Sequence, residues 1–227
     1  MLRIALLCCL LCFSVSAKAE ADAYNRVDFH VEAAREVAND LLVATMSADI
    51  QDKLPARVAQ QLNTALNDAL RKAATFSTVK TSSGNQHTYP VYGKNNQINA
   101  WRGHGEIRLE SRDSKAAGEL IMQLQATLQL GSVQFMVAPD TRIQIENSLI
   151  AEAIKAFQSR AEAIRTAVGA KSFKTVHFAI ISGDMPPHYP VALMRSDAVS
   201  GNAIPAPEFA GGDSRMTVQI NGTIELQ

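Results

Sequence analysis

The feature that most constrains the fold is the alternation of two hydrophobic periods along the chain. Some stretches place apolar side chains at every second residue, such as 26–34 with Val27 and Phe29, and these are typical of strands that bury one face. Other stretches place apolar residues three and four positions apart, such as 54–73 and 139–168, and these are typical of amphipathic helices. A chain that alternates the two periods is predicted to adopt an α+β fold in which helices cover sheets.

The predicted elements follow one another as β-β-α-β-β-α-β-α-β-β. Their ranges are 26–34, 40–50, 54–73, 78–92, 97–110, 117–128, 133–138, 139–168, 172–182 and 215–226. The polar residues 36–39 and 93–96 are predicted to be turns. The order predicts a single domain over 20–227, with an antiparallel or mixed sheet and three main helices packed on one of its faces.

The helix ends carry capping signals. Asp113 or Ser114 is placed to cap the second helix. Thr141 and Gln144 have the spacing of a capping box at the start of the third helix, and Gly169 follows that helix as a natural stop. The buried face of the third helix is predicted to consist of Ile143, Ile150, Ile154, Phe157, Ala161, Ile164 and Val168.

Residues 1–19 have the order of a secretory signal peptide. Arg3 precedes an apolar run of about a dozen residues, shorter than the roughly 20 that a membrane-spanning helix needs, and small residues follow it. Ala17 and Ala19 predict cleavage between Ala19 and Glu20, with a cut after Ala17 as the second choice. We therefore expect a periplasmic or secreted protein, and the alternative is an uncleaved N-terminal anchor.

Cleavage would remove every cysteine, because all three lie in the first twelve residues. The mature chain would then have no disulfide, no thiolate zinc site and no cysteine nucleophile. It would also lose Arg3 and Lys18 from a balanced set of 22 basic and 22 acidic residues, which leaves a net charge of −2. This charge argues against nucleic acid as a partner, and no later apolar run is long enough to be a membrane helix.

The chain contains no specific catalytic motif. The chain has no G-x-S-x-G elbow, no P-loop and no H-E-x-x-H pair. His30 with Asp28 and His104 with Glu106 are two residues apart in predicted strands, so each pair shares a sheet face and is interpreted as a hydrogen-bonded surface pair. His177 lies in an apolar strand and is predicted to be half-buried. We expect no catalytic residue, no metal ligand and no cofactor, and hence a protein that is not an enzyme.

Two segments remain as candidate binding surfaces. Tyr89, Tyr92 and Trp101 lie in and around one predicted hairpin, where they could form a binding platform or simply pack at the end of the sheet. The segment 183–212 contains five of the eight prolines and is interpreted as a long exposed loop.

The chain resembles the SIMPL-domain family of exported bacterial proteins over roughly residues 25–227. The resemblance rests on the helix sequence PARVAQQLNTALNDAL and on the stretches Tyr89-Pro90-Val91-Tyr92 and 98–103. It also includes the last helix, with its Ala-Phe-x-x-Arg-Ala run, and the closing strand VQINGTIEL. The chain departs from the family pattern at Pro90 and Trp101. The resemblance implies a periplasmic α+β protein. It also implies a link to oxidative-stress defence, a ring-like oligomer in at least one relative, and no catalytic residues.

Two hypotheses follow. The first is a non-enzymatic exported protein that forms homo-oligomers and supports envelope or oxidative-stress tolerance. The second is a periplasmic protein that binds a small ligand or peptide, or an unrecognised hydrolase, and uses the 183–212 loop as a lid.

Overall fold

The computed structural model describes residues 25–184 and 211–227. The predicted cleavage site between Ala19 and Glu20 and most of the predicted 183–212 loop lie outside the described residues.

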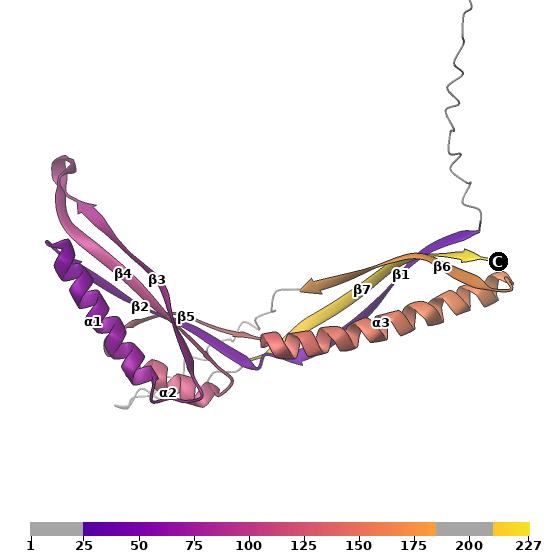
Figure 1. The fold of residues 1–227 in the computed structure, drawn as a ribbon, viewed down its shortest axis with the longest axis horizontal. Coiled ribbons are helices and arrows are strands. Elements are labelled where there is room, and N and C mark those ends of the chain that lie inside the picture. Colours follow the sequence, from indigo (N-terminus) through magenta and orange to yellow (C-terminus); the bar gives the residue numbers. More distant parts are fainter. Residues whose placement is uncertain (1–24, 185–210) are drawn as a thin grey trace, which may run out of the picture.

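The described chain is an α+β fold, as predicted (Figure 1). Its elements are β1 (Arg26–Ala38), β2 (Leu41–Asp52), α1 (Pro55–Ala73), β3 (Lys80–Tyr92), the 3-10 turn η1 (Lys94–Asn96), β4 (Ile98–Ser111), α2 (Ser114–Leu124), β5 (Gln129–Met136), α3 (Pro139–Val168), β6 (Phe173–Asp184) and β7 (Asp213–Leu226). The first strand continues through the turn predicted at 36–39, because Glu36 pairs with Arg215 and Ala38 pairs with Asp213 in the ladder between β1 and β7.

The prediction of one sheet covered by three helices is wrong, because the strands form two antiparallel sheets. One sheet has the order β1-β7-β6 and the other the order β3-β4-β2-β5. In Figure 1 each sheet has its own helices, α3 on the first and α1 with α2 on the second. We call these the α3 lobe and the α1–α2 lobe. The α1–α2 lobe is built from the continuous segment 41–136, whereas the α3 lobe joins β1 to α3, β6 and β7.

The α1–α2 lobe encloses its own hydrophobic core. Side chains of α1 such as Val58 and Leu62 are fully buried against β2 and β4, where Met46 and Ile107 are also inaccessible to solvent. Asp113 caps α2, because its side chain accepts a hydrogen bond from the N–H of Ala116 at 3.0 Å. The predicted amphipathic helix at 54–73 is confirmed almost residue for residue.

The α3 lobe has a second, separate core, in which α3 lies over β1 and β7. The buried side chains of α3 are Leu149, Ala153, Phe157 and Ala161, which are four residues apart. The predicted buried face is therefore partly wrong, because Ile143 and Val168 are exposed by 58% and 64%. The predicted capping box is also wrong, since Ala138 is the N-cap and no side chain caps the helix there. Gly169 ends α3 in the left-handed conformation (φ 77°), as predicted.

Hydrogen bonds hold together the crossings between the two lobes. The side-chain amide of Asn39 donates to the carbonyl of Gly211 at 2.9 Å, and its oxygen accepts from Ser214 at 2.6 Å. Asp40 accepts from the N–H of Ala138 and from the hydroxyl of Thr141, both at 2.7 Å. Two adjacent residues between β1 and β2 therefore bind the start of β7 and the start of α3.

Asp40 is ionised at this crossing. Partial burial raises the pKa of its carboxyl group, but the hydrogen bonds from Ala138 and Thr141 and the charge of Arg112 more than compensate, so that the net pKa lies below its ordinary value. Arg112 is 3.4 Å from Asp40 and also binds Asp140 in the first turn of α3. An acidic residue in that turn also interacts favourably with the helix dipole.

Gly222→Ala should destabilise the α3 lobe. A Cβ at this position would lie 2.5 Å from Cε2 of Phe157 and 3.0 Å from the carbonyl oxygen of His177. The Phe157 ring is stacked on Phe29 at 4.6 Å and has little room to move. We expect a loss of about 1–3 kcal/mol in the free energy of unfolding, measured in urea. Gly183→Ala is the control, because a Cβ there meets nothing within 4 Å. Equal stability of the two variants would contradict this packing.

Asp40→Asn should destabilise the protein at neutral pH but much less in acid. A carboxyl group whose pKa is lowered by folding stabilises the protein above its unfolded pKa of 3.8, and this contribution is lost as the pH falls through the lower folded value. The difference in urea midpoint between the parent protein and Asp40→Asn should therefore shrink from pH 7 to pH 3. A difference that is constant over this range would show that the charge of Asp40 does not stabilise the crossing.

Candidate interaction surface

Strand β6 is an edge of its sheet with an exposed apolar surface. Val176, Phe178, Ile180 and Ile181 are exposed by 42%, 45%, 40% and 48%. His177 is exposed as well, so the prediction that it is half-buried is wrong. In the sheet order β1-β7-β6, the other edge of β6 has no neighbouring strand among the described residues.

Incomplete cover by α3 explains the exposure of Phe178 and Ile180, whereas Ile181 pairs with Gln219 and points to the opposite face of the sheet. A helix with its side chains is roughly 10 Å across, and strands lie about 4.8 Å apart, so one helix covers about two strands. Helix α3 lies over β1 and β7. Phe178 and Ile180 pair with Gly222 and Ile220, so they point to the same face as the α3 core but lie beyond the helix.

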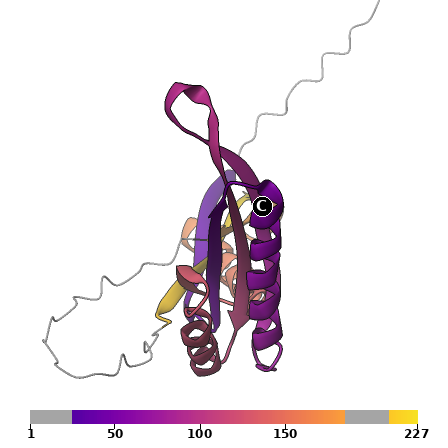
Figure 2. The ribbon, with the colours of Figure 1, turned by 90° about the vertical axis from the view of Figure 1, so that its left-hand side faces the viewer.

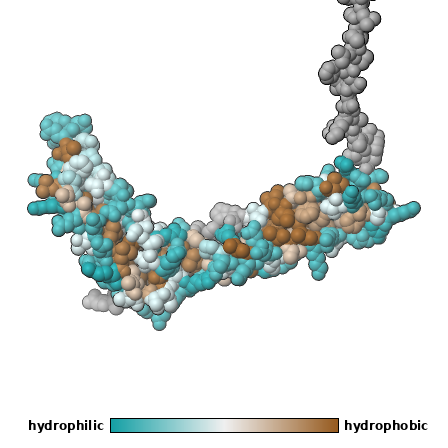
Figure 3. All heavy atoms as spheres, in the orientation of Figure 1, coloured by the Kyte–Doolittle hydropathy of each residue, from teal (hydrophilic) through white to brown (hydrophobic). Residues whose placement is uncertain are grey.

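The flank of α3 that faces β6 is also apolar. Two contacts locate this flank: Ser182 donates a hydrogen bond to Glu146 at 2.6 Å, and the rings of Phe157 and Phe178 are 6.1 Å apart. Residues 143, 146, 150, 154 and 157 are three or four positions apart, so they lie on one side of the helix. We call the set formed by Ile143, Ile150, Ile154, Phe178 and Ile180 the apolar strip. Figure 3 shows apolar atoms gathered over this part of the α3 lobe.

The other sheet edges carry the features that usually protect an edge from pairing. Charged side chains, proline, short length and bulges all discourage the addition of a strand. Strand β1 has five charged residues among thirteen, Arg26, Asp28, Glu32, Arg35 and Glu36. Strand β3 contains Gly84 and Pro90, and β5 has eight residues and an irregular register. In contrast, the segment 175–183 of β6 contains no Asp, Glu, Lys or Arg.

A second candidate region lies on the uncovered polar face of the α1–α2 lobe. Nδ1 of His104 is 3.1 Å from Asp49, and Nε2 is 3.1 Å from Glu106. Carboxylates only accept hydrogen bonds, so both contacts are hydrogen bonds at the same time only when the imidazole is protonated and charged. Hydrogen bonds to Glu106 and then to Asp49 raise the pKa of His104 above its ordinary value, although partial burial opposes them. This geometry ties β2 to β4 and occupies both ring nitrogens.

The structure places the three predicted hairpin residues on different faces. Strands β3 and β4 form the predicted hairpin, which extends beyond the rest of the α1–α2 lobe (Figure 2). Tyr89 pairs with Arg102 and stacks near His87, with ring centroids 5.7 Å apart. Trp101 is the neighbour of Arg102 along β4, so it lies on the opposite face from Tyr89. Tyr92 is exposed farther along the hairpin. Tyr89 and Trp101 therefore do not share one surface.

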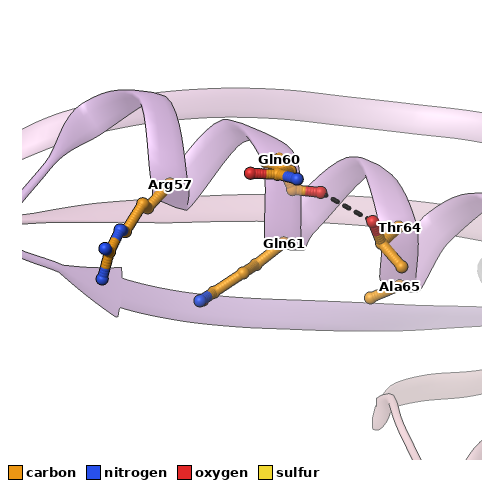
Figure 4. Close-up of a pocket in the computed structure, with 5 residues that line it drawn as sticks. All are labelled: Arg57, Gln60, Gln61, Thr64 and Ala65. Atoms are coloured by element: carbon orange, nitrogen blue, oxygen red, sulfur yellow. Dashed lines mark hydrogen bonds between the residues drawn. The ribbon is translucent and has the colours of Figure 1, made fainter.

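The surface hollow shown in Figure 4 offers no converging chemistry. It is lined by five residues of α1, Arg57, Gln60, Gln61, Thr64 and Ala65. The hydroxyl of Thr64 donates to the carbonyl of Gln60 at 2.9 Å, so it is satisfied within the helix. Within residues 25–184 and 211–227, no group of three or more His, Asp or Glu side chains could hold a metal ion, and no helix is both long and apolar enough to cross a membrane.

The apolar strip was missed from the sequence, although a signal for it was present. The segment 175–183 has no charged residue, but its sequence predicts only an apolar strand with a half-buried His177. A strand edge that pairs with another chain also lacks charged residues.

His104→Gln should cost stability mainly at low pH. A histidine whose pKa is raised by folding contributes its full stability below the unfolded pKa of 6.5, and this contribution disappears as the pH rises through the higher folded value. For a partly exposed group we expect a loss of up to about 1 kcal/mol at pH 6 and a smaller one at pH 9. Urea denaturation at both pH values measures this. In parallel, an NMR titration should show a lower His104 pKa in Glu106→Gln than in the parent, and an unchanged value would contradict the assigned contact.

The chain matches the model of a known protein family. Residues 27–224 match the model of the SIMPL family, described as a protein of unknown function (DUF541). A search of curated proteins finds no match to the chain.

Proposed function

The chain belongs to the SIMPL family, and from that premise we propose that it is an exported, non-enzymatic protein that assembles with copies of itself. We further propose that this assembly supports tolerance of the cell envelope to oxidative stress. Export rests on the order of residues 1–19, a charged residue, a short apolar run and then small residues. The stress role rests on the family resemblance.

The observation that carries the proposal is the unprotected edge of β6 beside the apolar strip. An edge strand with exposed main-chain donors and acceptors and apolar side chains favours the addition of another strand. Exposed apolar patches bordered by polar residues mark interaction sites in soluble proteins. Here the two features coincide, since Phe178 and Ile180 belong to both.

The polar cluster around His104 fits a structural role better than a catalytic one. Each ring nitrogen lies 3.1 Å from a carboxylate on a neighbouring position of the same open sheet face. A general base needs a free ring nitrogen within reach of the proton that it removes. The ring therefore stabilises the pairing of β2 with β4, which supports the proposal of a protein that acts by assembly.

The double variant Phe178→Glu/Ile180→Glu should be monomeric, whereas the parent protein should form a discrete oligomer. Two carboxylates at the edge replace apolar contacts by charges that would lose hydration in an interface. Light scattering at several protein concentrations measures the mass, and circular dichroism checks that the fold is kept. Met122→Glu is the matched control, because Met122 is similarly exposed (46%) but lies on α2 in the other lobe. A monomeric parent protein would refute the assembly proposal.

The role in cells is tested with the same pair of variants. A deletion strain should survive peroxide less well than its parent, and the Met122→Glu gene should restore survival. The Phe178→Glu/Ile180→Glu gene should fail to restore it at equal protein level. Equal survival of the deletion strain and its parent across growth phases would refute the stress role while leaving assembly untouched.

A further inference from the structure

The free edge of β6 can pair with either edge strand of the same sheet in a second copy. Pairing with β1 of the next copy is head-to-tail and leaves a free β6 and a free β1 at the two ends, so the assembly grows into a ring or a fibre. Pairing of β6 with β6 buries both unprotected edges at once and closes the assembly as a dimer. The two modes predict different oligomers from the same exposed strand.

Strand β1 is a poor partner for β6. Its five charged residues would face a segment, 175–183, that has no charged residue to pair with them. Four of these charges already bind within the α3 lobe: Arg26 to Glu225, Asp28 to Thr223, Glu32 to Arg215 and Arg35 to Glu152. An apolar strand beside them would remove water from these pairs without adding a partner, which is costly. A second β6 brings only apolar and small polar side chains opposite the same segment. The composition of the two edges therefore selects the β6–β6 pair.

Symmetry then restricts the register. In an antiparallel pair related by a two-fold axis perpendicular to the sheet, facing residues point to the same face of the sheet. Along the regular part of β6, residues that point to the same face are two positions apart. A residue can therefore face only a residue of the other copy whose number differs from its own by zero or by an even number. The axis must then lie at the level of one residue, which faces its own counterpart, and not between two residues. Phe178, Ala179 and Ile180 are the three central positions through which it could pass.

The exposed side chains favour Ala179. With the axis there, Phe178 of each copy faces Ile180 of the other on the α3 side, and both apolar residues gain an apolar partner. An axis at Ile180 would place Phe178 opposite Ser182, whose hydroxyl is already bonded to Glu146. An axis at Phe178 would place Ile180 opposite Val176, at the irregularity between Thr175 and His177.

We propose that two copies of this chain pair through β6, antiparallel about a two-fold axis at Ala179. The product is a six-stranded sheet with the order β1-β7-β6-β6-β7-β1 and with both α3 helices on one face. Each copy places its Phe178 and Ile180 between the two helices, beside the Ile143, Ile150 and Ile154 flank that α3 leaves exposed or half-buried. This proposal rests on the proposed function and names the partner and register of the same surface.

A cysteine scan of β6 tests the register. The full chain with Cys8, Cys9 and Cys12 replaced by Ser has no other cysteine. In Ala179→Cys the two thiols would face each other across the axis, where directly opposed Cα atoms are about 4.5–5.5 Å apart, within the range of a disulfide. We expect Ala179→Cys to give a disulfide-linked dimer on mild oxidation. Ser182→Cys should remain monomeric on a non-reducing gel, because its two copies would be roughly 20 Å apart.

The other outcomes separate this inference from the proposed function. Maximal cross-linking at Phe178→Cys or Ile180→Cys would overturn the register. Cross-linking of Ala179→Cys to Glu32→Cys, with none in Ala179→Cys alone, would overturn the β6–β6 pair in favour of head-to-tail growth, while assembly itself would stand. A parent protein that is monomeric by light scattering would overturn both proposals.

A charge variant provides a test that does not depend on oxidation. Ala179→Lys places two cations at the axis and should convert the dimer into a monomer. Ala34→Lys is the control, because Ala34 is an exposed alanine on β1 of the same sheet. Dissociation by Ala34→Lys but not by Ala179→Lys would overturn the proposal, as would a dimer that neither variant dissociates.

Discussion

In the α3 lobe one helix lies over a three-stranded sheet. Because the helix is narrower than the sheet, one strand stays uncovered, and the exposed apolar surface of the lobe results from this difference in width. A helix roughly 10 Å wide covers about two strands, so α3 protects β1 and β7 and leaves β6 outside. The α1–α2 lobe has two helices for its four strands, and the large apolar side chains exposed on its sheet, Tyr89, Tyr92 and Ile98, lie in the β3–β4 hairpin. The two lobes therefore differ in what they offer to a partner, even though both are helix-on-sheet layers.

Two adjacent side chains connect these lobes. Asn39 and Asp40 occupy the short link between β1 and β2, and their hydrogen bonds reach Gly211, Ser214, Ala138 and Thr141. Asp40 thus binds this link to the other described crossing, from β5 to α3, and Asn39 binds it to the start of β7. The same link separates the two cores, because β1 belongs to one sheet and β2 to the other. A protein that assembles through one lobe can then present the other lobe, with its protruding β3–β4 hairpin, in a defined orientation.

The helices were predictable from sequence because their signal is local. The helix α1 (Pro55–Ala73) matches its predicted range of 54–73, and Gly169 ends α3 as expected, since apolar spacing and terminal residues act within a few turns. The buried face of α3 was predicted less well. Its periodic residues span a wide arc, and only the contact with β1 and β7 decides that Leu149 is buried while Ile143 is exposed. The same holds for the hairpin residues. Tyr89 and Trp101 lie in one hairpin, but only the strand register shows that they point to opposite faces.

The sequence by itself determined the class of fold, the helix positions, the family and the absence of charge in 175–183. These depend on periodicity, on terminal signals and on composition, all of which are properties of neighbouring residues. Only the tertiary structure decided that the strands form two sheets, that β1 pairs with β7 and that β6 is an edge. The physical reason is that strand pairing joins residues far apart in the chain, and an apolar strand has the same sequence pattern at the centre of a sheet as at an edge that a partner covers.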